Sequence, residues 1–499
     1  MRLGKIPEDV RKLIIPMPSG EMVYECLGCG AKFPIQRLYY VCPSCKSLML
    51  LKDLKFDRLI RVGANYWHRL FDHRLMVNHQ SVRGVFCYHE FIAPEIPEED
   101  IVFLGEAHTP MVQAPDELVK EIGARMYFKL DGLNPTASFK DRGMACALTF
   151  AKYLKRVQKL NNLMTVCAST GDTSAAAALY AASLGPEVKS VVLLPKGYVT
   201  PQQLSQPLGA GATVIELPGV FDDCMKVVER LSEIYNVVLL NSKNPWRVLG
   251  QESYAYEVAQ QFDYELRDMV LFVPVGNAGN ITAILSGLLK FFRAKVLIRL
   301  PRIIAVQSAR ANPVYKYFLK PLEQRVFKPV EVTPSVAQAA MIGNPVSFPR
   351  LNRLAREYVE EMGQDSFGVV EVTEENIMES MVMANRRGLT ICTQGGEALA
   401  GLRVAKASGL FKAQETAVID STAHALKFID FQNAYFNGTL ESEYGIVSKP
   451  ELTNKLHSLE LKGVKVPSLG TEMSQEEKED FVIAAAEEIG NSLGLSPKD

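Results

Sequence analysis

The alternation of strand-like and helix-like segments between about residues 105 and 435 is the feature that most constrains how this 499-residue chain can fold. Short apolar runs predict strands at 125–130, 163–167, 188–194, 213–217, 237–241, 269–275, 303–307 and 415–420. Helix-length apolar periodicity separates them, as at 222–235 and 251–261. Such alternation favours parallel sheets covered by helices, so we predict an α/β fold.

Three of the predicted strands lead into unusual loops. The segment 134–143 reads Asn-Pro-Thr-Ala-Ser-Phe-Lys-Asp-Arg-Gly and places Lys140 before an apolar run at 144–154. The segment 168–174 is rich in hydroxyls and precedes an alanine-rich stretch, while 276–280 reads Gly-Asn-Ala-Gly-Asn. Each loop also has a plain interpretation, as a solvated lysine, a helix-capping cluster or a chain reversal. Together they predict a pyridoxal phosphate site: an amine, a polar loop and a glycine-rich phosphate cradle.

These loops resemble the second structural class (fold type II) of pyridoxal phosphate enzymes and, within it, the threonine synthase family. Further matches are Gly105-Glu106 leading to Thr109-Pro110, the segment 241–247 and the segment 342–345. The resemblance covers about residues 105–430 in the motif order of that family. It implies a two-lobed fold with a smaller lobe at about 145–265.

The resemblance also implies roles for individual residues. Lys140 would form the Schiff base with the cofactor, Phe139 would pack beside the ring, and Thr422 would face the pyridine nitrogen. The remaining cofactor contacts implied are Asp172, near the phenolic oxygen, and Gly276, Asn277, Ala278, Gly279 and Asn280 at the phosphate. The implied substrate-binding residues are Ser169, Thr170, Thr173, Asn241 and Arg247.

The activity implied is conversion of O-phospho-L-homoserine and water to L-threonine and phosphate. This sequence departs from the family pattern at 250–253, at 393–397, and at Ala423 and Ala425, which replace glycines. The alternatives are a cysteate synthase, acting on phosphoserine and sulfite, or another fold type II lyase such as threonine dehydratase. A binding protein without catalysis is a third interpretation, which an intact Lys140 with all the cofactor loops argues against.

Nine cysteines divide into one cluster and five isolated residues. Cys26-x2-Cys29 and Cys42-x2-Cys45 have the spacing of a four-cysteine zinc ribbon, because each turn offers two thiolates to one ion. We expect this zinc to be structural and remote from the chemistry. The other cysteines are scattered through apolar segments, which is typical of buried thiols in a reducing compartment.

The sequence thus predicts four parts: a zinc-ribbon-like unit at 1–55, a connector at 56–104, the catalytic domain at 105–435 and a helical extension at 436–499. In the last part, Ser474 to Glu477 has the pattern of a capping box before a helix at 481–493. A formal net charge of −1 gives no general attraction to nucleic acid or to membrane surfaces. We expect a cytoplasmic enzyme, assembled as a homodimer, that acts on a small phosphorylated amino acid.

Overall fold

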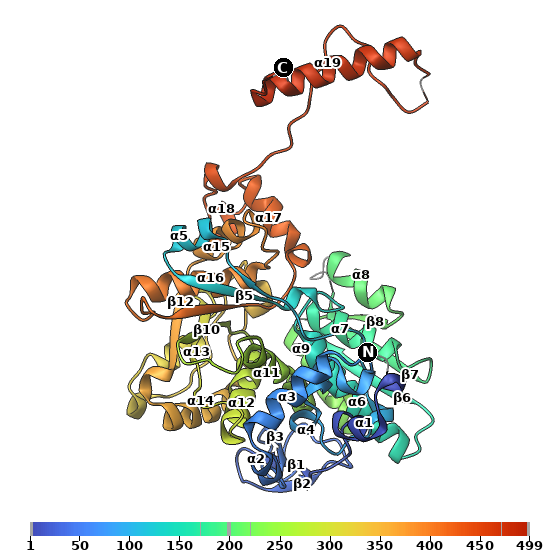
Figure 1. The fold of residues 1–499 in the computed structure, drawn as a ribbon, viewed down its shortest axis with the longest axis vertical. Coiled ribbons are helices and arrows are strands. Elements are labelled where there is room, and N and C mark those ends of the chain that lie inside the picture. Colours follow the sequence, from blue (N-terminus) through green and yellow to red (C-terminus); the bar gives the residue numbers. More distant parts are fainter. Residues whose placement is uncertain (1–2, 170, 197–200, 220, 471, 497–499) are drawn as a thin grey trace. The chain divides into compact units, whose positions relative to one another are not determined.

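A computed structural model of the chain describes residues 3–169, 171–196, 201–219, 221–470 and 472–496. By the density of contacts the chain divides into one unit at Met1–Ser448 and a second at Lys449–Asp499. Figure 1 follows the chain through both units.

The larger sheet of the first unit has six strands in the order β12-β11-β10-β13-β5-β4. Their bounds are Met111–Gln113 (β4), Arg125–Leu130 (β5), Met269–Pro274 (β10), Arg302–Ser308 (β11), Phe367–Val372 (β12) and Thr416–Ser421 (β13). All neighbours are parallel except the edge strand β4, which is antiparallel to β5. Its central strands are buried almost throughout, as expected of a parallel sheet covered on both faces.

The smaller sheet has four parallel strands in the order β8-β7-β6-β9. Their bounds are Leu163–Ala168 (β6), Val188–Pro195 (β7), Thr213–Leu217 (β8) and Val237–Leu239 (β9). The two parallel sheets confirm the predicted α/β fold and contain all eight predicted strands, six of them with shifted ends. The strand at 237–241 ends at Leu239, and β4 and β12 are additional.

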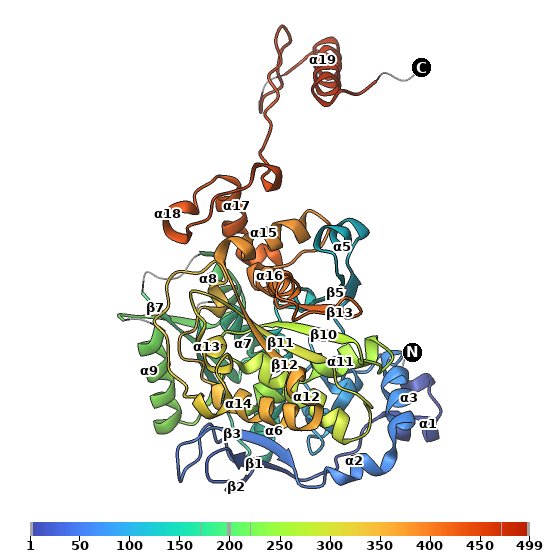
Figure 2. The ribbon, with the colours of Figure 1, turned by 90° about the vertical axis from the view of Figure 1, so that its left-hand side faces the viewer.

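Helices cover both faces of the larger sheet. Figure 2 shows α15 and α16 on one side of it and α12 and α14 on the other. The helices of this part are α5 (Asp116–Ile122), α10 (Pro245–Gln251), α11 (Ser253–Gln261), α12 (Gly279–Arg293), α13 (Pro313–Phe318), α14 (Phe348–Met362), α15 (Glu374–Asn385), α16 (Thr393–Ala407), α17 (Ile429–Phe436) and α18 (Glu441–Tyr444). Those around the smaller sheet are α6 (Lys140–Val157), α7 (Asp172–Ala182), α8 (Pro201–Gly209) and α9 (Phe221–Ile234).

The cysteine-containing segment forms a separate three-stranded antiparallel sheet, in the order β2-β1-β3. It consists of Met22–Cys26 (β1), Lys32–Pro34 (β2) and Met49–Asp53 (β3), drawn dark blue at the bottom of Figure 1. The segment 56–104 that follows contains α2 (Asp57–Val62), α3 (Ala64–Leu75) and α4 (His89–Ile92); α1 (Glu8–Ile14) precedes the sheet. Trp67 and Phe71 of α3 belong to the same hydrophobic core as Tyr24 of β1 and Leu285 of α12.

Two glycines allow α6 and α10 to approach closely. A β-carbon on Gly250 would lie 2.2 Å from the carbonyl oxygen of Arg142, and one on Gly143 would lie 3.0 Å from that of Arg247. No larger residue fits at such a backbone contact without displacing a helix. The contact brings the first turn of α6, which carries Lys140, against α10, which carries Arg247.

The second unit contains a short 3-10 helix, Pro450–Leu452, and α19, Gln475–Leu493. Ser474 accepts from the amide of Glu477 (3.1 Å), and the Glu477 carboxylate accepts from the amide of Ser474 (2.8 Å). This reciprocal pair confirms the predicted capping box. Within the described residues, no helix combines the length and apolar character that crossing a membrane would require.

Candidate functional site

A cavity of about 1880 Å³ is lined by the loops that follow the carboxyl ends of strands from both parallel sheets. β5 leads to Lys140, β6 to Ser169, β9 to Asn241, β10 to Gly276 and β13 to Thr422. Ligands of parallel α/β sheets bind at this end of the strands. The predicted cofactor and substrate residues therefore meet in one cavity, and they comprise Phe139, Lys140, Ser169, Asp172, Thr173, Asn241, Arg247, Gly276, Asn277, Ala278, Gly279, Asn280 and Thr422. Thr170 lies outside the described residues.

Lys140 is the first residue of α6, and its side chain is half-buried at the cavity wall. Its Nζ lies 3.9 Å from the centroid of the Phe139 ring. Burial, together with the positive charges of Arg247 and Lys427, lowers the pKa of Lys140 to about 7, against the opposing charge of Asp172. A substantial fraction of the side chain is therefore an uncharged amine at neutral pH, which is the nucleophilic form.

The residues before Lys140 fold the loop back on the helix. The amide and hydroxyl of Thr136 both donate to the Asp141 carboxylate at 2.8 Å, and the Asn134 amide group donates to the carbonyl of Asp131 at 2.8 Å. Ala137 adopts a left-handed conformation, with φ at 62°. These contacts preorganise the turn and so fix the position of the Lys140 backbone at the start of α6.

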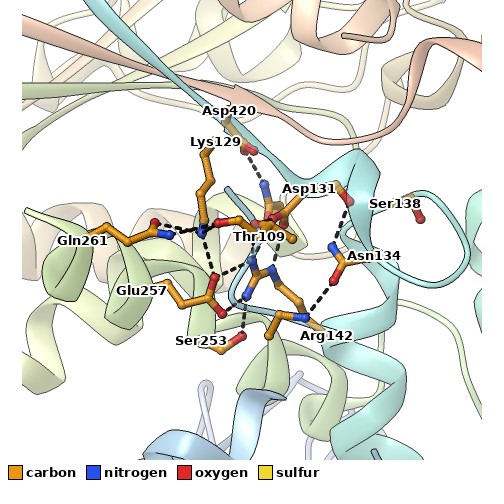
Figure 3. A network of polar contacts seen from close by, with 12 residues as sticks. Thr109, Lys129, Asp131, Asn134, Ser138, Arg142, Ser253, Glu257, Gln261 and Asp420 are labelled. Atoms are coloured by element: carbon orange, nitrogen blue, oxygen red, sulfur yellow. Dashed lines mark hydrogen bonds and ion pairs between the residues drawn. The ribbon is translucent and has the colours of Figure 1, made fainter. Parts of the chain in front are cut away.

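A fully buried polar network joins the start of this loop at Asp131 to Arg142 of α6 and Glu257 of α11 (Figure 3). Arg142 donates to both oxygens of Asp131 (2.8 and 2.7 Å) and to both oxygens of Glu257 (2.5 and 2.9 Å). Lys129 donates to Glu257 at 2.7 Å. Burial alone would raise the pKa of Glu257, but Arg142 and Lys129 hold it well below its ordinary range. The network keeps two cations and two carboxylates paired, and its Arg142 lies two residues after Lys140 on α6.

The Lys140 loop is also joined to the loop after β13. The amide of Phe139 donates to the carbonyl of Thr422 (2.8 Å), and the amide of His424 donates to that of Ala137 (3.0 Å). The hydroxyl of Thr422 lies 3.7 Å from the thiol of Cys392, which is the N-cap residue of α16. A neutral hydroxyl is therefore held at the wall of the cavity that Lys140 also lines.

The loop 276–280 presents backbone amides to the cavity. Ala278 is left-handed, with φ at 60°, and is the N-cap residue of α12. No backbone amide from 276 to 280 donates to a protein acceptor in the described chain. Converging free amides at a helix N-terminus form an anion site. The side chain of Asn280 turns away from this cradle and donates to Asp420 at 2.7 Å.

The hydroxyl-rich loop after β6 begins α7 at Asp172. The Asp172 carboxylate pairs with Lys427 (2.9 Å), and the Ser169 hydroxyl accepts from the amide of Gly171 (3.2 Å). Lys427 also donates to the carbonyl of Thr136 at 2.9 Å, so it links this loop to the Lys140 loop. The sequence analysis did not identify Lys427, although its place seven residues after a predicted strand end was a usable signal.

Arg247 is a buried cation without a carboxylate partner among the described residues. Its Nη1 donates to the carbonyl of Leu240 (2.9 Å), while its Nε has no partner in the described chain. Burial lowers its pKa to about 10. Glu252, the nearest acid in the sequence, is occupied by Lys290 (2.7 Å) and Ser286 (2.6 Å). The guanidinium therefore faces the cavity with its charge uncompensated.

Asn241 has a partner for each end of its amide. Its Oδ1 accepts from the amide of Ala168 (3.0 Å), and its Nδ2 donates to the carbonyl of the same residue (2.7 Å). This pair ties the loop after β9 to the end of β6. Because an amide nitrogen carries two hydrogens, one remains for a ligand.

The four clustered cysteines lie at the tips of two turns, with their sulfurs within 4.8 Å of one another. The Cys26–Cys45 and Cys29–Cys42 sulfurs are 3.3 and 3.7 Å apart. A zinc ion with four bonds of about 2.3 Å requires sulfurs about 3.8 Å apart, so the four thiols fit it.

That the proposed zinc is remote from the chemistry stays a prediction: none of the four cysteines lines the cavity, although residues next to them do. Leu27, Gly28, Lys46, Ser47 and Leu48 of the cysteine unit line the cavity together with Lys140 and Arg247. Spacing along the sequence gave no indication of this shared lining, because these residues lie about one hundred residues from Lys140 and about two hundred from Arg247.

Comparison with known proteins gives consistent results. Residues 102–421 match a family model described as pyridoxal-phosphate dependent enzyme. Threonine synthase of Methanocaldococcus jannaschii is 34% identical over 413 residues, covering 81% of this chain and 93% of that protein. Threonine synthase 2, chloroplastic, of Arabidopsis thaliana is 33% identical over 397 residues, covering 77% and 73%. In fold, the chain is similar to the crystal structure of threonine synthase from Escherichia coli, with a TM-score of 0.61 at 23% identity, covering 87% and 92%.

Proposed function

The chain belongs to the pyridoxal-phosphate-dependent enzymes and, among them, to the threonine synthases, and we propose that its cavity binds two phosphates at two separate places. It is a lyase that converts O-phospho-L-homoserine and water to L-threonine and phosphate. The observation that carries the proposal is the presence, in one cavity, of a glycine-rich amide cradle and of an unpaired buried guanidinium at Arg247.

The cradle and Lys140 fit pyridoxal phosphate. The free amides from 276 to 280 suit its phosphate, and the amine of Lys140 would hold it covalently. Phe139 would contact the ring, and Thr422 would face the ring nitrogen. Bound there, the cofactor would act as an electron sink. It would accept the electron pair left behind when the hydrogen on the substrate α-carbon is removed as a proton.

Lys140 is the proton carrier in this proposal. With its pKa lowered to about 7, its Nζ can accept a proton from the α-carbon and return one to the γ-carbon near neutral pH. The amine lies at the start of a helix pinned by the Arg142 network, so its reach is limited to a small volume of the cavity. This positioning favours transfers between neighbouring carbons of one substrate.

Arg247 is the proposed site for the substrate's phosphate. The planar guanidinium offers several parallel donors to a phosphate, and the cofactor's phosphate already has the amide cradle. Ser169 and Thr173 lie on the neighbouring loop, after β6, and are proposed to hold the substrate carboxylate, while Asn241 offers one remaining amide hydrogen.

We further propose that Cys26, Cys29, Cys42 and Cys45 bind one zinc ion. Four thiolates fill its coordination sphere and leave no position for a substrate or an activated water, so its role is structural. All nine cysteines are unpaired thiols in this structure, which supports a reducing, cytoplasmic location. A homodimer remains an expectation that light scattering would test.

The substrate assay separates this proposal from its rivals. Purified protein with cofactor should release L-threonine and phosphate in equal amounts from O-phospho-L-homoserine, and borohydride reduction should fix the cofactor to Lys140. Phosphoserine with sulfite is the comparison for a cysteate synthase, and threonine alone is the comparison for a dehydratase. Turnover of either comparison substrate in preference to O-phospho-L-homoserine, or full turnover by Lys140→Ala, would refute the proposal.

A further inference from the structure

The two cysteine turns have the same backbone but end in different residues. The amide of Gly30 donates to the carbonyl of Cys26 (3.1 Å), and the amide of Lys46 donates to that of Cys42 (2.9 Å). Both residues are left-handed, with φ at 70° and 62°. Gly30 and Lys46 therefore occupy equivalent positions, each directly after its Cys-x2-Cys turn.

A glycine is the residue that such a position favours. The left-handed region is disfavoured for residues with a β-carbon, and lysine gains nothing there from local hydrogen bonding of its side chain. A β-carbon on Gly30 would meet no atom within 4 Å, so its backbone alone accounts for the glycine. Lysine at the second turn is thus a departure from local preference. Lys159 and Lys295 adopt the same conformation, with φ at 53° and 60°, so what distinguishes Lys46 is its place at the cavity.

Lys46 differs from Gly30 in what it faces. It lines the cavity, whereas Gly30 does not. Three further cations that line the cavity, Lys243, Arg353 and Lys226, each have an acidic neighbour. Lys243 pairs with Glu229 (2.7 Å), and Arg353 pairs with Glu25 (3.3 Å). Lys226 likewise lies 3.6 Å from Asp223. No acid partner of Lys46 is present within the described residues. Lys46 is exposed, so its charge is available to a ligand at the mouth.

The cysteine unit is braced against the loop that leads to Arg247. The fully buried Arg350 donates to the carbonyls of Met49 in β3, Ser242 and Lys243, each at 2.9 Å. Trp246, next to Arg247, donates to the hydroxyl of Tyr24 in β1 at 2.9 Å. The second cysteine turn is therefore fixed relative to the loop that leads into Arg247.

We propose that Lys46 is a specificity-determining residue, which attracts the phosphate end of the substrate at the cavity mouth, and that the cysteine unit serves to present it. The identity of the anion rests on the proposed function, in which the substrate carries a phosphate. A cation at the mouth of a cleft raises the local concentration of anions and does not take part in the chemistry.

Lys46→Gln and Lys32→Gln form a matched pair of variants. Both remove one exposed positive charge from the cysteine unit, but Lys32 lies in β2 and does not line the cavity. We expect Lys46→Gln to raise KM for O-phospho-L-homoserine about tenfold, to weaken the dependence of kcat/KM on salt, and to leave kcat within about twofold. Lys32→Gln should behave as the unaltered protein.

Lys46→Gly separates charge from backbone. It restores the residue that the turn prefers, so we expect the same rise in KM with bound zinc retained and with Tm equal or higher. An unchanged KM in both Lys46 variants would overturn the inference, whatever their stability. So would an equal effect of Lys32→Gln.

Binding of inorganic phosphate to the cofactor-loaded protein gives a readout besides turnover. Calorimetry should show weaker phosphate binding in Lys46→Gln and not in Lys32→Gln, and equal affinities would count against Lys46. If the unaltered protein does not convert O-phospho-L-homoserine, the proposed function fails, but the phosphate titration still tests Lys46 by itself.

Discussion

The ammonium of Lys427 lies 2.9 Å from the carboxylate of Asp172, and the charges of both act on Lys140. Asp172 raises the pKa of Lys140 and Lys427 lowers it, while burial and Arg247 contribute more to the lowering. The Asp172–Lys427 pair therefore adjusts the pKa of the Lys140 amine through charge, without contacting the amine.

Lys427→Met should raise the pKa of Lys140. The substitution removes one positive charge and leaves Asp172 unpaired, and both changes favour the protonated amine. Because only the unprotonated amine attacks the cofactor aldehyde, the rate of cofactor uptake by cofactor-free protein should rise with pH later than in the unaltered protein. Asp172→Asn should move the profile the opposite way. A shift of the same sign in both variants would contradict this assignment.

Arg142→Met should destabilise the fold strongly. The substitution removes the Arg142 guanidinium from the fully buried carboxylates of Asp131 and Glu257. Removal of one partner from a buried ion pair costs about 3–5 kcal/mol of stability. Arg293→Met is the comparison, since Arg293 is 42% exposed where it pairs with Glu357, and it should cost at most about 1 kcal/mol. Urea denaturation measures both. Equal losses would show that the network does not anchor the Lys140 turn.

Two glycines in the phosphate cradle should respond differently to alanine. A β-carbon on Gly276 would lie 2.8 Å from the α-carbon of Ala340, whereas one on Gly279 has no neighbour closer than 3.8 Å. Gly276→Ala should therefore lower the Tm of the cofactor-free protein. Gly279→Ala should leave that Tm unchanged and weaken cofactor binding, because it adds a methyl group to the cavity-lining loop proposed to hold the phosphate. Calorimetry and cofactor titration separate the two effects, and a reversed order would argue against this cradle.

Much of this arrangement could be predicted from the sequence. The strands that carry the site, the lysine loop and the glycine cradle are local patterns, and all of them fall where β5, β6, β10 and β13 end. Contacts between distant segments could not be predicted in the same way. The pairing of Asp172 with Lys427 and the placing of Lys46 at the cavity depend on how the lobes and the cysteine unit pack.

The partners of Arg247 likewise could not be predicted from the sequence. The nearest acid along the sequence is Glu252, five residues after Arg247. In the structure Glu252 points instead to Lys290 of α12, which leaves Arg247 to the cavity. The direction of a helical side chain depends on which face of the helix is packed, and that becomes visible only in three dimensions.

Removal of the proposed zinc should be detectable at a tryptophan. The chain has two tryptophans, and Trp246 donates to Tyr24 of the cysteine unit. In a Trp67→Phe background, chelation should change the emission of Trp246 and release one zinc per chain. Cys45→Ser should show the changed emission without chelator, whereas Cys224→Ser, outside the cluster, should not. Full zinc content in Cys45→Ser would refute the four-cysteine site.

The central claim is that the cavity keeps the substrate's phosphate on Arg247 and the cofactor's phosphate on the amide cradle. Arg247→Met removes the buried cation and leaves the cradle untouched. Arg353→Met is the comparison, because Arg353 lies on the same cavity wall but already pairs with Glu25 and Glu357. It should alter kcat/KM by less than about threefold.

The deciding measurement is kcat/KM for O-phospho-L-homoserine in Arg247→Met, with bound cofactor determined on the same sample from its absorbance. Loss of a charge-assisted contact at a buried site costs about 2–5 kcal/mol, so we predict a fall of roughly two decades or more with the cofactor retained. Loss of the cofactor, with KM unchanged in the activity that remains, would show that Arg247 holds the cofactor's phosphate and would contradict the claim.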